Sequence, residues 1–366
     1  MKLILSIVVL FSVCFYCKAQ TSDFDSLVVS FGTRVGPFFE DSISVPSIYK
    51  GKDFNISLAD SSIGFKTKTI VINSPNPNSL FPLSYSVIYK GHVISLFEPG
   101  HYACFRLSDF SRNKNLEAAL NKRKFKAHWL IDNKLYGLSK GRFWYLNSSN
   151  NWIKTQKLPL KVNSKSHLYE NKDYIVFSDC NGEWGGTVYF YNRETKETYF
   201  TEATCANTVT KDEEGFKILS HLGHEGGSAD LKLVPDPTKL TNLKNLKTKR
   251  INIETNEFSN STKHVAELFD FYWIQLFSSF EWEDKILYVV HWQNRTFLAE
   301  INGNKVLIVD PLFNSDLYTH EPITKKYASG EIFINLDDYG TAVEREISMI
   351  LIRDKEIIKI DWNKKH

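Results

Sequence analysis

Short apolar runs rich in Val, Ile, Tyr, Phe and Trp make up most of this chain, and turns of Asn, Asp, Lys and Gly separate them. This pattern is typical of β-strands, because β-branched and aromatic side chains suit a pleated, half-buried surface. Apolar residues at helical spacing are scarce, and the one helix that the pattern predicts covers residues 116–124. The sequence therefore predicts an all-β protein with a single short helix.

A turn followed by a short apolar strand recurs along the chain. Ile-Tyr-Lys-Gly occurs at residues 48–51 and again at residues 88–91, and related turns follow. Taking the last turn residue of each unit gives positions 51, 91, 134, 172, 215, 285 and 330, with gaps of 40, 43, 38, 43, 70 and 45 residues. A period of about 40–50 residues with four short strands per repeat is typical of a β-propeller. We predict one propeller domain over residues 20–366, with seven blades favoured and six or eight allowed.

The longest gap holds a polar insertion near residues 235–267 that is rich in Lys, Asn and Thr. A solvated loop between two strands is the favoured interpretation, ahead of a separate functional element. The main rival fold for the whole chain is a pair of β-sandwiches, which would need a linker. No break rich in Pro, Gly or Ser divides the chain, so the propeller is preferred.

Residues 1–19 have the pattern of a secretory signal peptide, with Lys2, an apolar run and small residues before a cleavage point after Ala19. A membrane anchor is the alternative, but the run is shorter than the roughly 20 residues that span a bilayer. A lipoprotein signal is disfavoured because Val13 and Tyr16 stand before the cysteines, where small residues are needed. We predict a secreted or periplasmic protein with no transmembrane anchor after cleavage.

The net charge is close to zero. The chain has 45 Lys and Arg against 42 Asp and Glu, and removal of the two signal lysines lowers the formal charge from +3 to +1. A nucleic-acid partner is therefore not expected. Cys180 and Cys205 lie in connections that return to the same face of a propeller, so we predict a disulfide between them. Cys104 lies in a predicted strand and is expected to be a small buried residue.

The candidate site lies on one rim of the predicted propeller. Strands alternate in direction, so all loops between second and third strands gather on one face. Glycines in these loops permit positive φ and shaped turns, and the two tryptophans could stack on a sugar or anchor a protein. The candidate residues are Asp179, Asn181, Glu183, Trp184, His221, His224, Glu225, His291 and Trp292.

The residues of this rim can be compared with three known kinds of site: a calcium site, a zinc-hydrolase site and the carboxylate pair of a glycoside hydrolase. Asp179 to Glu183 present oxygen ligands at alternate positions, which suits calcium, but the other ligands of an EF-hand loop are missing. His221 and His224 resemble a zinc-hydrolase motif only superficially, because the glycines that follow disfavour the helix it needs. Paired carboxylates such as Glu183 and Glu225 would suit glycoside hydrolysis. No cofactor is predicted, and calcium is the one metal kept as a candidate.

Residues 178–186, Ser-Asp-Cys-Asn-Gly-Glu-Trp-Gly-Gly, are followed by His-Glu-Gly-Gly-Ser-Ala at residues 224–229. Together they resemble motifs in secreted bacterial β-propeller proteins whose role is mostly uncharacterised. The resemblance covers two of the predicted blades and implies the fold and a bacterial secretory setting, but no activity.

The favoured function is a recognition module that binds a glycan, peptide or protein through this polar, aromatic rim. The alternative is a hydrolase or lyase that acts on glycans at the same rim through Glu183, Glu225, His221 and His224. Propellers host both classes, so the fold does not choose between them and the enzyme question stays open.

Overall fold

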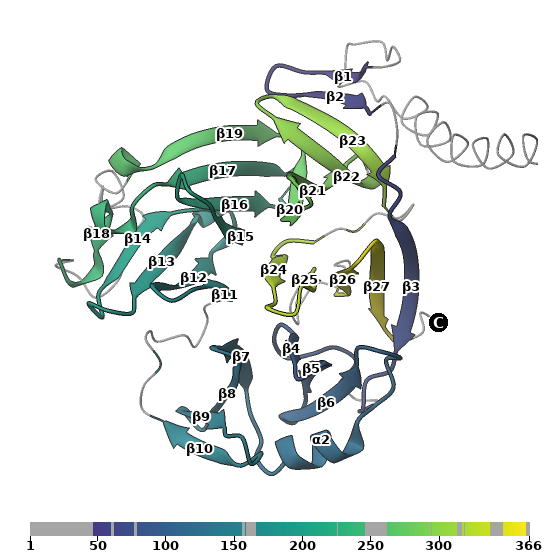
Figure 1. Ribbon diagram of the computed structural model, residues 1–366, viewed down its shortest axis with the longest axis vertical. Helices are drawn as coiled ribbons and strands as arrows, with labels where there is room; N and C mark the ends of the chain where they lie inside the picture. The colour runs from purple at the N-terminus through teal and green to yellow at the C-terminus, as the bar shows by residue number, and fades with distance from the viewer. Residues whose placement is uncertain are drawn as a thin grey trace, which may run out of the picture.

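The structure is a computed structural model that describes residues 47–59, 62–76, 79–155, 158, 166–224, 226–245, 262–293, 295–312, 317, 319–336 and 347–363. The predicted signal peptide lies outside these residues. Within them, the strands form six sheets arranged in a ring (Figure 1). Two cavities lie at its centre, and we call the space that they occupy the central channel. Each sheet is one blade of a β-propeller, so the predicted fold class is confirmed. We number the blades 1 to 6 in chain order.

The two inner strands of each blade form an antiparallel hairpin beside the channel. The innermost strands are β4 (Val87–Tyr89), β7 (Ala127–Ile131), β11 (Ser166–Glu170), β15 (Ala206–Lys211), β20 (Gln275–Trp282) and β24 (Ile323–Lys326). The second strands are β5 (His92–Phe97), β8 (Lys134–Ser139), β12 (Tyr174–Cys180), β16 (Phe216–Leu222), β21 (Lys285–Trp292) and β25 (Ile332–Asn335). The turns that join these pairs coincide with the last six predicted turns.

The outer strands complete the blades. The third strands are β6 (His101–Arg106), β9 (Arg142–Leu146), β13 (Gly186–Asn192), β17 (Ser228–Val234), β22 (Arg295–Asn302) and β26 (Met349–Arg353). Blades 2 to 6 have a fourth strand, namely β10 (Trp152–Thr155), β14 (Thr198–Glu202), β19 (Ala266–Tyr272), β23 (Lys305–Pro311) and β27 (Glu356–Trp362). Loops between second and third strands therefore lie on the same face as the connections between blades. We call this face the rim.

Blade 1 has a helix where the other blades have a fourth strand. Helix α2 (Lys114–Leu120) overlaps the predicted helix and follows β6. The side-chain amide of Asn121 accepts a hydrogen bond from the backbone N–H of Tyr102 and donates one to its carbonyl oxygen. The Glu117 carboxylate accepts from the backbone N–H of Cys104, which is buried as predicted. These contacts satisfy the outer edge of β6, which would otherwise be open to pairing.

The first predicted repeat unit is not a blade, which is why the count is six and not the favoured seven. β1 (Ser47–Lys50) and β2 (Asn55–Leu58) form a hairpin that extends blade 5, because β2 pairs in parallel with β23. A lone hairpin is only marginally stable in water, and here Phe54 and Ile56 are buried against blade 5. β3 (Lys66–Ile72) then pairs in parallel with β27, so the N-terminal strands are joined to the last two blades.

The predicted polar insertion separates β17 from β19, and residues 246–261 of it lie outside the described residues. Strand β18 (Thr241–Asn242), which it contains, pairs with β14 and so ties the insertion to blade 3 (Figure 1). Leu240 beside it is buried in the core shared by blades 3 and 4. The described elements of the insertion are η2 (Pro237–Lys239), β18 (Thr241–Asn242), η3 (Leu243–Asn245) and η5 (Thr262–His264).

Buried apolar side chains fill the space between neighbouring blades. Phe277 and Leu287 of blade 5, for example, pack with Ile334 and Ile350 of blade 6. A single blade cannot bury both of its faces, so each depends on its neighbours for a core. This mutual packing fixes the positions from which the rim loops project.

Candidate functional site

The loop between β12 and β13 presents Trp184 to solvent, with 71% of the residue exposed. A 3-10 turn, η1 (Gly182–Trp184), forms its tip. The N–H of Asn181 donates to the carbonyl oxygen of Gly185 at 2.8 Å, and the N–H of Trp184 donates to that of Asn181 at 3.2 Å. Gly182 and Gly185 have φ values of 61° and 87°, which a residue with a Cβ rarely adopts. The short, closed loop therefore holds the indole outward.

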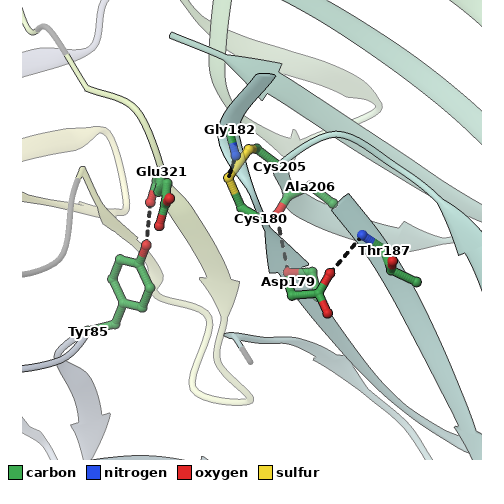
Figure 2. Close-up of a disulfide and its surroundings, with 9 residues drawn as sticks. Tyr85, Asp179, Cys180, Gly182, Thr187, Cys205, Ala206 and Glu321 are labelled. Atoms are coloured by element: carbon green, nitrogen blue, oxygen red, sulfur yellow. Dashed lines mark hydrogen bonds between the residues drawn. A yellow bond between two sulfur atoms is a disulfide. The ribbon is translucent and has the colours of Figure 1, made fainter. Parts of the chain in front are cut away.

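A disulfide between Cys180 and Cys205 joins the base of this loop to the connection that enters blade 4 (Figure 2). The predicted bridge is confirmed. Gly186 packs closely between β12 and the same connection, because a Cβ there would lie 2.5 Å from the carbonyl oxygen of Asp179 in β12 and 2.7 Å from that of Ala203 in the connection. The loop is thus tied to blade 4 by a kind of bridge that persists in oxidising compartments.

Asp179 is held by its own blade. Its carboxylate accepts a hydrogen bond from the backbone N–H of Thr187 at 3.0 Å, drawn in Figure 2, and another from the Tyr189 hydroxyl at 2.8 Å. Burial, and then the Asp179 charge, raise the pKa of Tyr189, so its hydroxyl stays a donor. Asp179 therefore reinforces the rim end of the β12–β13 pair.

Glu183 and His224 come from adjacent blades and meet on the rim. Glu183 Oε2 lies 4.0 Å from His224 Nδ1, and each side chain is 54% exposed. A contact this open to water contributes little to stability, so both groups are available to a ligand. Glu225, the next candidate residue, lies outside the described residues.

The other two candidate histidines lie beneath the rim. His221 is fully buried, with Nε2 3.3 Å from Gln275 Oε1. Burial, and then His320 and His291, lower the pKa of His221 to about 3, so its imidazole is neutral at pH 7. His291 is buried and stacks on the Phe277 ring, with 5.5 Å between ring centroids. Neither side chain reaches a ligand bound at the surface.

A different histidine stands beside His224. The ring centroid of His320 lies 6.5 Å from that of His224. A Cβ on Gly223 would lie 2.3 Å from the carbonyl oxygen of Thr319, so the segment that carries His320 packs directly on this loop. The sequence reasoning missed His320 because it lies outside the loops between second and third strands.

Of the two tryptophans predicted on the rim, Trp184 is exposed and Trp292 is not. Trp292 ends β21 and is buried, with its ring 5.3 Å from that of Tyr49 in the added hairpin. Tyr272 ends β19 and Trp273 follows it, and the two residues are 56% and 60% exposed. Trp273 lies in a connection between blades, as Cys205 does, so the argument that placed Cys205 on this face also applies to Trp273.

The loop that follows β16 links these aromatic residues to Glu183. The backbone N–H of Trp273 donates to the carbonyl oxygen of Gly227 at 2.9 Å. A Cβ on Gly226 would overlap the Trp273 ring, so the indole lies against this loop. His224 in the same loop faces Glu183, and Trp184 follows Glu183. We call the set of Trp184, Glu183, His224, Tyr272 and Trp273 the aromatic rim patch.

A cavity of about 390 Å³ lies at the centre of the rim, where the innermost strands begin. Asp179 and the disulfide line one side of it. On another side, Ser84 Oγ lies 3.0 Å from His128 Nδ1. Burial lowers the pKa of His128 to about 4, so this histidine is also neutral. The Tyr85 hydroxyl donates to the carbonyl oxygen of Glu321 across the cavity wall (Figure 2).

No family model and no curated protein matches this chain. Several solved structures are similar to it. Virginiamycin B lyase from Staphylococcus aureus is 10% identical, with a TM-score of 0.38 over 80% of this chain and 88% of that one. The N-terminal domain of Nup159 is 8% identical, with a TM-score of 0.36 over 83% of this chain and 87% of that one. BamB from Moraxella catarrhalis is 7% identical, with a TM-score of 0.33 over 77% of this chain and 70% of that one. The propeller assignment rests on this chain's own strand pairing.

The described residues hold no cluster of three or more His, Cys, Asp or Glu side chains arranged to bind a metal ion. Calcium at residues 179–183 stays a prediction. No helix in the described part of the chain is long and apolar enough to cross a membrane.

Proposed function

We propose that this protein is an extracytoplasmic recognition module that binds a glycan, peptide or protein through the aromatic rim patch. The observation that carries the proposal is the exposure of Trp184, Trp273 and Tyr272 on one face, each by more than half. Large aromatic side chains supply most of the binding energy in many interfaces, and exposed apolar surface gathered on one face marks interaction sites.

The loops that carry these side chains support the proposal. Trp184 projects from a closed turn braced by the Cys180–Cys205 disulfide, and Trp273 is bonded to the backbone of Gly227. Side chains on fixed loops lose little conformational entropy when a ligand binds. The half-exposed Glu183 and His224 between them offer hydrogen bonds that would orient a polar ligand.

The compartment forms part of the same proposal. The disulfide and the predicted signal peptide both favour a secreted or periplasmic protein. A ligand there would be a surface glycan, a secreted peptide or the ectodomain of another protein.

The test is a comparison of Trp184→Ala and Trp273→Ala with the native chain on a glycan array and a displayed-peptide library. We expect specific binding by the native chain and a loss of about 30-fold for each variant, which corresponds to about 2 kcal/mol. Ile153→Ala is the matched control, because Ile153 is an exposed apolar residue in β10 at the outer edge of blade 2. Equal binding by all four proteins would overturn the proposal.

A second candidate function, a glycan hydrolase or lyase, is favoured by the meeting of Glu183 and His224 at 4.0 Å. A carboxyl group beside an imidazole can act as an acid and base pair if a substrate excludes water from both. Chromogenic glycosides and polysaccharides would be assayed with the native chain, Glu183→Gln and His224→Gln. Turnover that both substitutions abolish, with melting temperatures retained, would establish the enzyme, whereas binding without turnover would exclude it for the substrates tested.

A further inference from the structure

Lys325 of β24 reaches across the central channel. Its Nζ donates a hydrogen bond to the backbone carbonyl oxygen of Leu130 in blade 2, at 2.7 Å. It also lies 2.9 Å from Nδ1 of His167 in blade 3. Blade 6, which carries Lys325, is next to neither of these blades in the ring (Figure 1). A single amine therefore connects three blades at the centre of the molecule.

The amine lies between two cavities. Leu130, Lys325 and Tyr327 line both the rim cavity and a second cavity of about 620 Å³ at the opposite face. His167 lines the rim cavity, and Glu170 lines the second one. Both volumes fall in the range of small-molecule sites. The Lys325 side chain is 14% exposed, so a small reagent can reach it.

The surroundings of the amine lower its proton affinity. Burial lowers the pKa of Lys325 to about 8, although Glu170 at 3.7 Å and the charge of Asp132 favour the protonated form. Arg193 pairs with Glu170 at 3.4 Å and with Asp132 at 2.7 Å. Its positive charge therefore weakens the attraction of these two carboxylates for the protonated lysine. Burial, and then Lys325, lower the pKa of His167, which leaves its ring neutral. Its Nδ1 also lies 2.8 Å from the Leu130 carbonyl oxygen, so Nδ1 donates to that oxygen in one tautomer and accepts from Lys325 Nζ in the other.

The charges near the amine also restrict what it can bind. An anionic ligand would be repelled by Glu170 and Asp132, and the short hydrogen bonds to Leu130 and His167 already occupy two of the three N–H positions of an ammonium group. A neutral carbonyl compound meets no such repulsion. A desolvated lysine that is partly unprotonated near neutral pH is the usual nucleophile toward such carbonyl groups.

We propose that Lys325 captures a small aldehyde as an imine at the centre of the channel. The Nζ lone pair attacks the carbonyl carbon, and the π electrons move to oxygen. His167 Nδ1, which is 2.9 Å from Nζ, takes a first proton from this nitrogen and passes it to the oxygen, which gives a neutral carbinolamine. The nitrogen lone pair then expels the hydroxyl group, which leaves as water with the second proton of the nitrogen, carried by the same ring. Amine and aldehyde thus give one imine and one water, and no oxidant or reductant is needed. This chemistry is independent of ligand binding at the rim.

The test uses the full chain, glycolaldehyde as the aldehyde, and cyanoborohydride to reduce any imine to a stable amine. Modified peptides are quantified over time at pH 7. The matched control is Lys326, the next residue of the same strand, whose side chain is 58% exposed and paired with Glu281. We expect modification of Lys325 to be about tenfold faster, because at pH 7 more of its amine is unprotonated than in an ordinary lysine.

Two further measurements separate reactivity from structure. The rate at Lys325 should level off above about pH 8, with the measured profile of the exposed Lys326 as the reference. His167→Asn should slow trapping at Lys325 about tenfold and leave Lys326 unchanged. Lys325→Arg keeps the charge and the donors, so it should keep the melting temperature and lose the adduct. Trapping at Lys325 no faster than at Lys326, or the same pH profile for both, would overturn the proposal and leave Lys325 as a structural tie.

Discussion

The surface of the rim and the layer directly beneath it contain the same residue types in opposite roles. His224 is half exposed and faces Glu183, whereas His221, three positions earlier, is fully buried beside Gln275. The two tryptophans show the same contrast, because Trp184 projects into solvent and Trp292 is packed under the added hairpin.

This contrast teaches that membership of a rim loop does not decide exposure. His221 and Trp292 are the last or next-to-last residues of strands β16 and β21, so their direction follows the alternation of side chains along a strand. Trp184 and His224 lie beyond the strand ends, where no such alternation applies. Polar and aromatic residues of the rim therefore divide into a structural layer and a binding surface.

The largest expected effect concerns acid stability and His221. Its pKa in the folded protein, about 3, is below the ordinary value of 6.5. Between these values the unfolded chain binds a proton that the folded chain does not. The free energy of unfolding is therefore undiminished above pH 6.5 and falls as the pH drops toward 3, by about 4 kcal/mol for this group. Urea denaturation at several pH values measures the dependence.

Two histidine variants sharpen this prediction. His221→Gln should show a clearly weaker dependence of the unfolding free energy on pH, whereas His224→Gln should keep that of the native protein. If both variants showed the same dependence of unfolding free energy on pH as the native protein, the predicted difference between the buried His221 and the exposed His224 would be wrong.

The next largest effect is expected from the disulfide that braces the rim surface. Cys180 and Cys205 are separated by 25 positions in the chain, and the entropy of closing such a loop predicts a loss of about 3.5 kcal/mol when both are replaced by Ala. Amide exchange in the Trp184 loop should accelerate in the same variant. In a strong reductant the native and variant proteins should unfold alike, which serves as the control. A double variant as stable as the oxidised native protein would contradict the prediction.

The smallest effect is expected from the exposed pair on the rim. Glu183→Gln and His224→Gln should each change the free energy of unfolding by less than about 0.5 kcal/mol, because a contact between half-exposed polar groups is screened by water and salt. Chemical denaturation at low and high salt gives the measurement. A loss above 1 kcal/mol would show that the pair is shielded from solvent and belongs to the structural layer.

The position of the candidate site could be predicted only in part. The placement of the rim loops follows from the turn pattern, and Trp184 lies on the surface of a loop rich in glycine. Tyr272, Trp273 and His320 were missed because they lie in other segments that reach the same face. Lys325 had no sequence signal, since its partners Leu130 and His167 are far away in the chain and adjacent only across the channel.

The sequence by itself determined the features that depend on local order. Alternating strands and tight turns require only near neighbours, and they predicted the propeller, the six inner hairpins and the short helix. The pairing of Cys180 with Cys205 also followed, because strand direction alone brings their connections to one face.

Only the tertiary structure decided how the repeats are used. The turn at residue 51 has the same local pattern as the six that begin blades, but its hairpin pairs with β23 and adds to blade 5. The choice depends on which unpaired strand edge is available and how much apolar surface the pairing buries, and both are properties of the assembled ring. The same holds for the burial of His221 and Trp292 and for the position of Lys325, because distant strands create each of these environments.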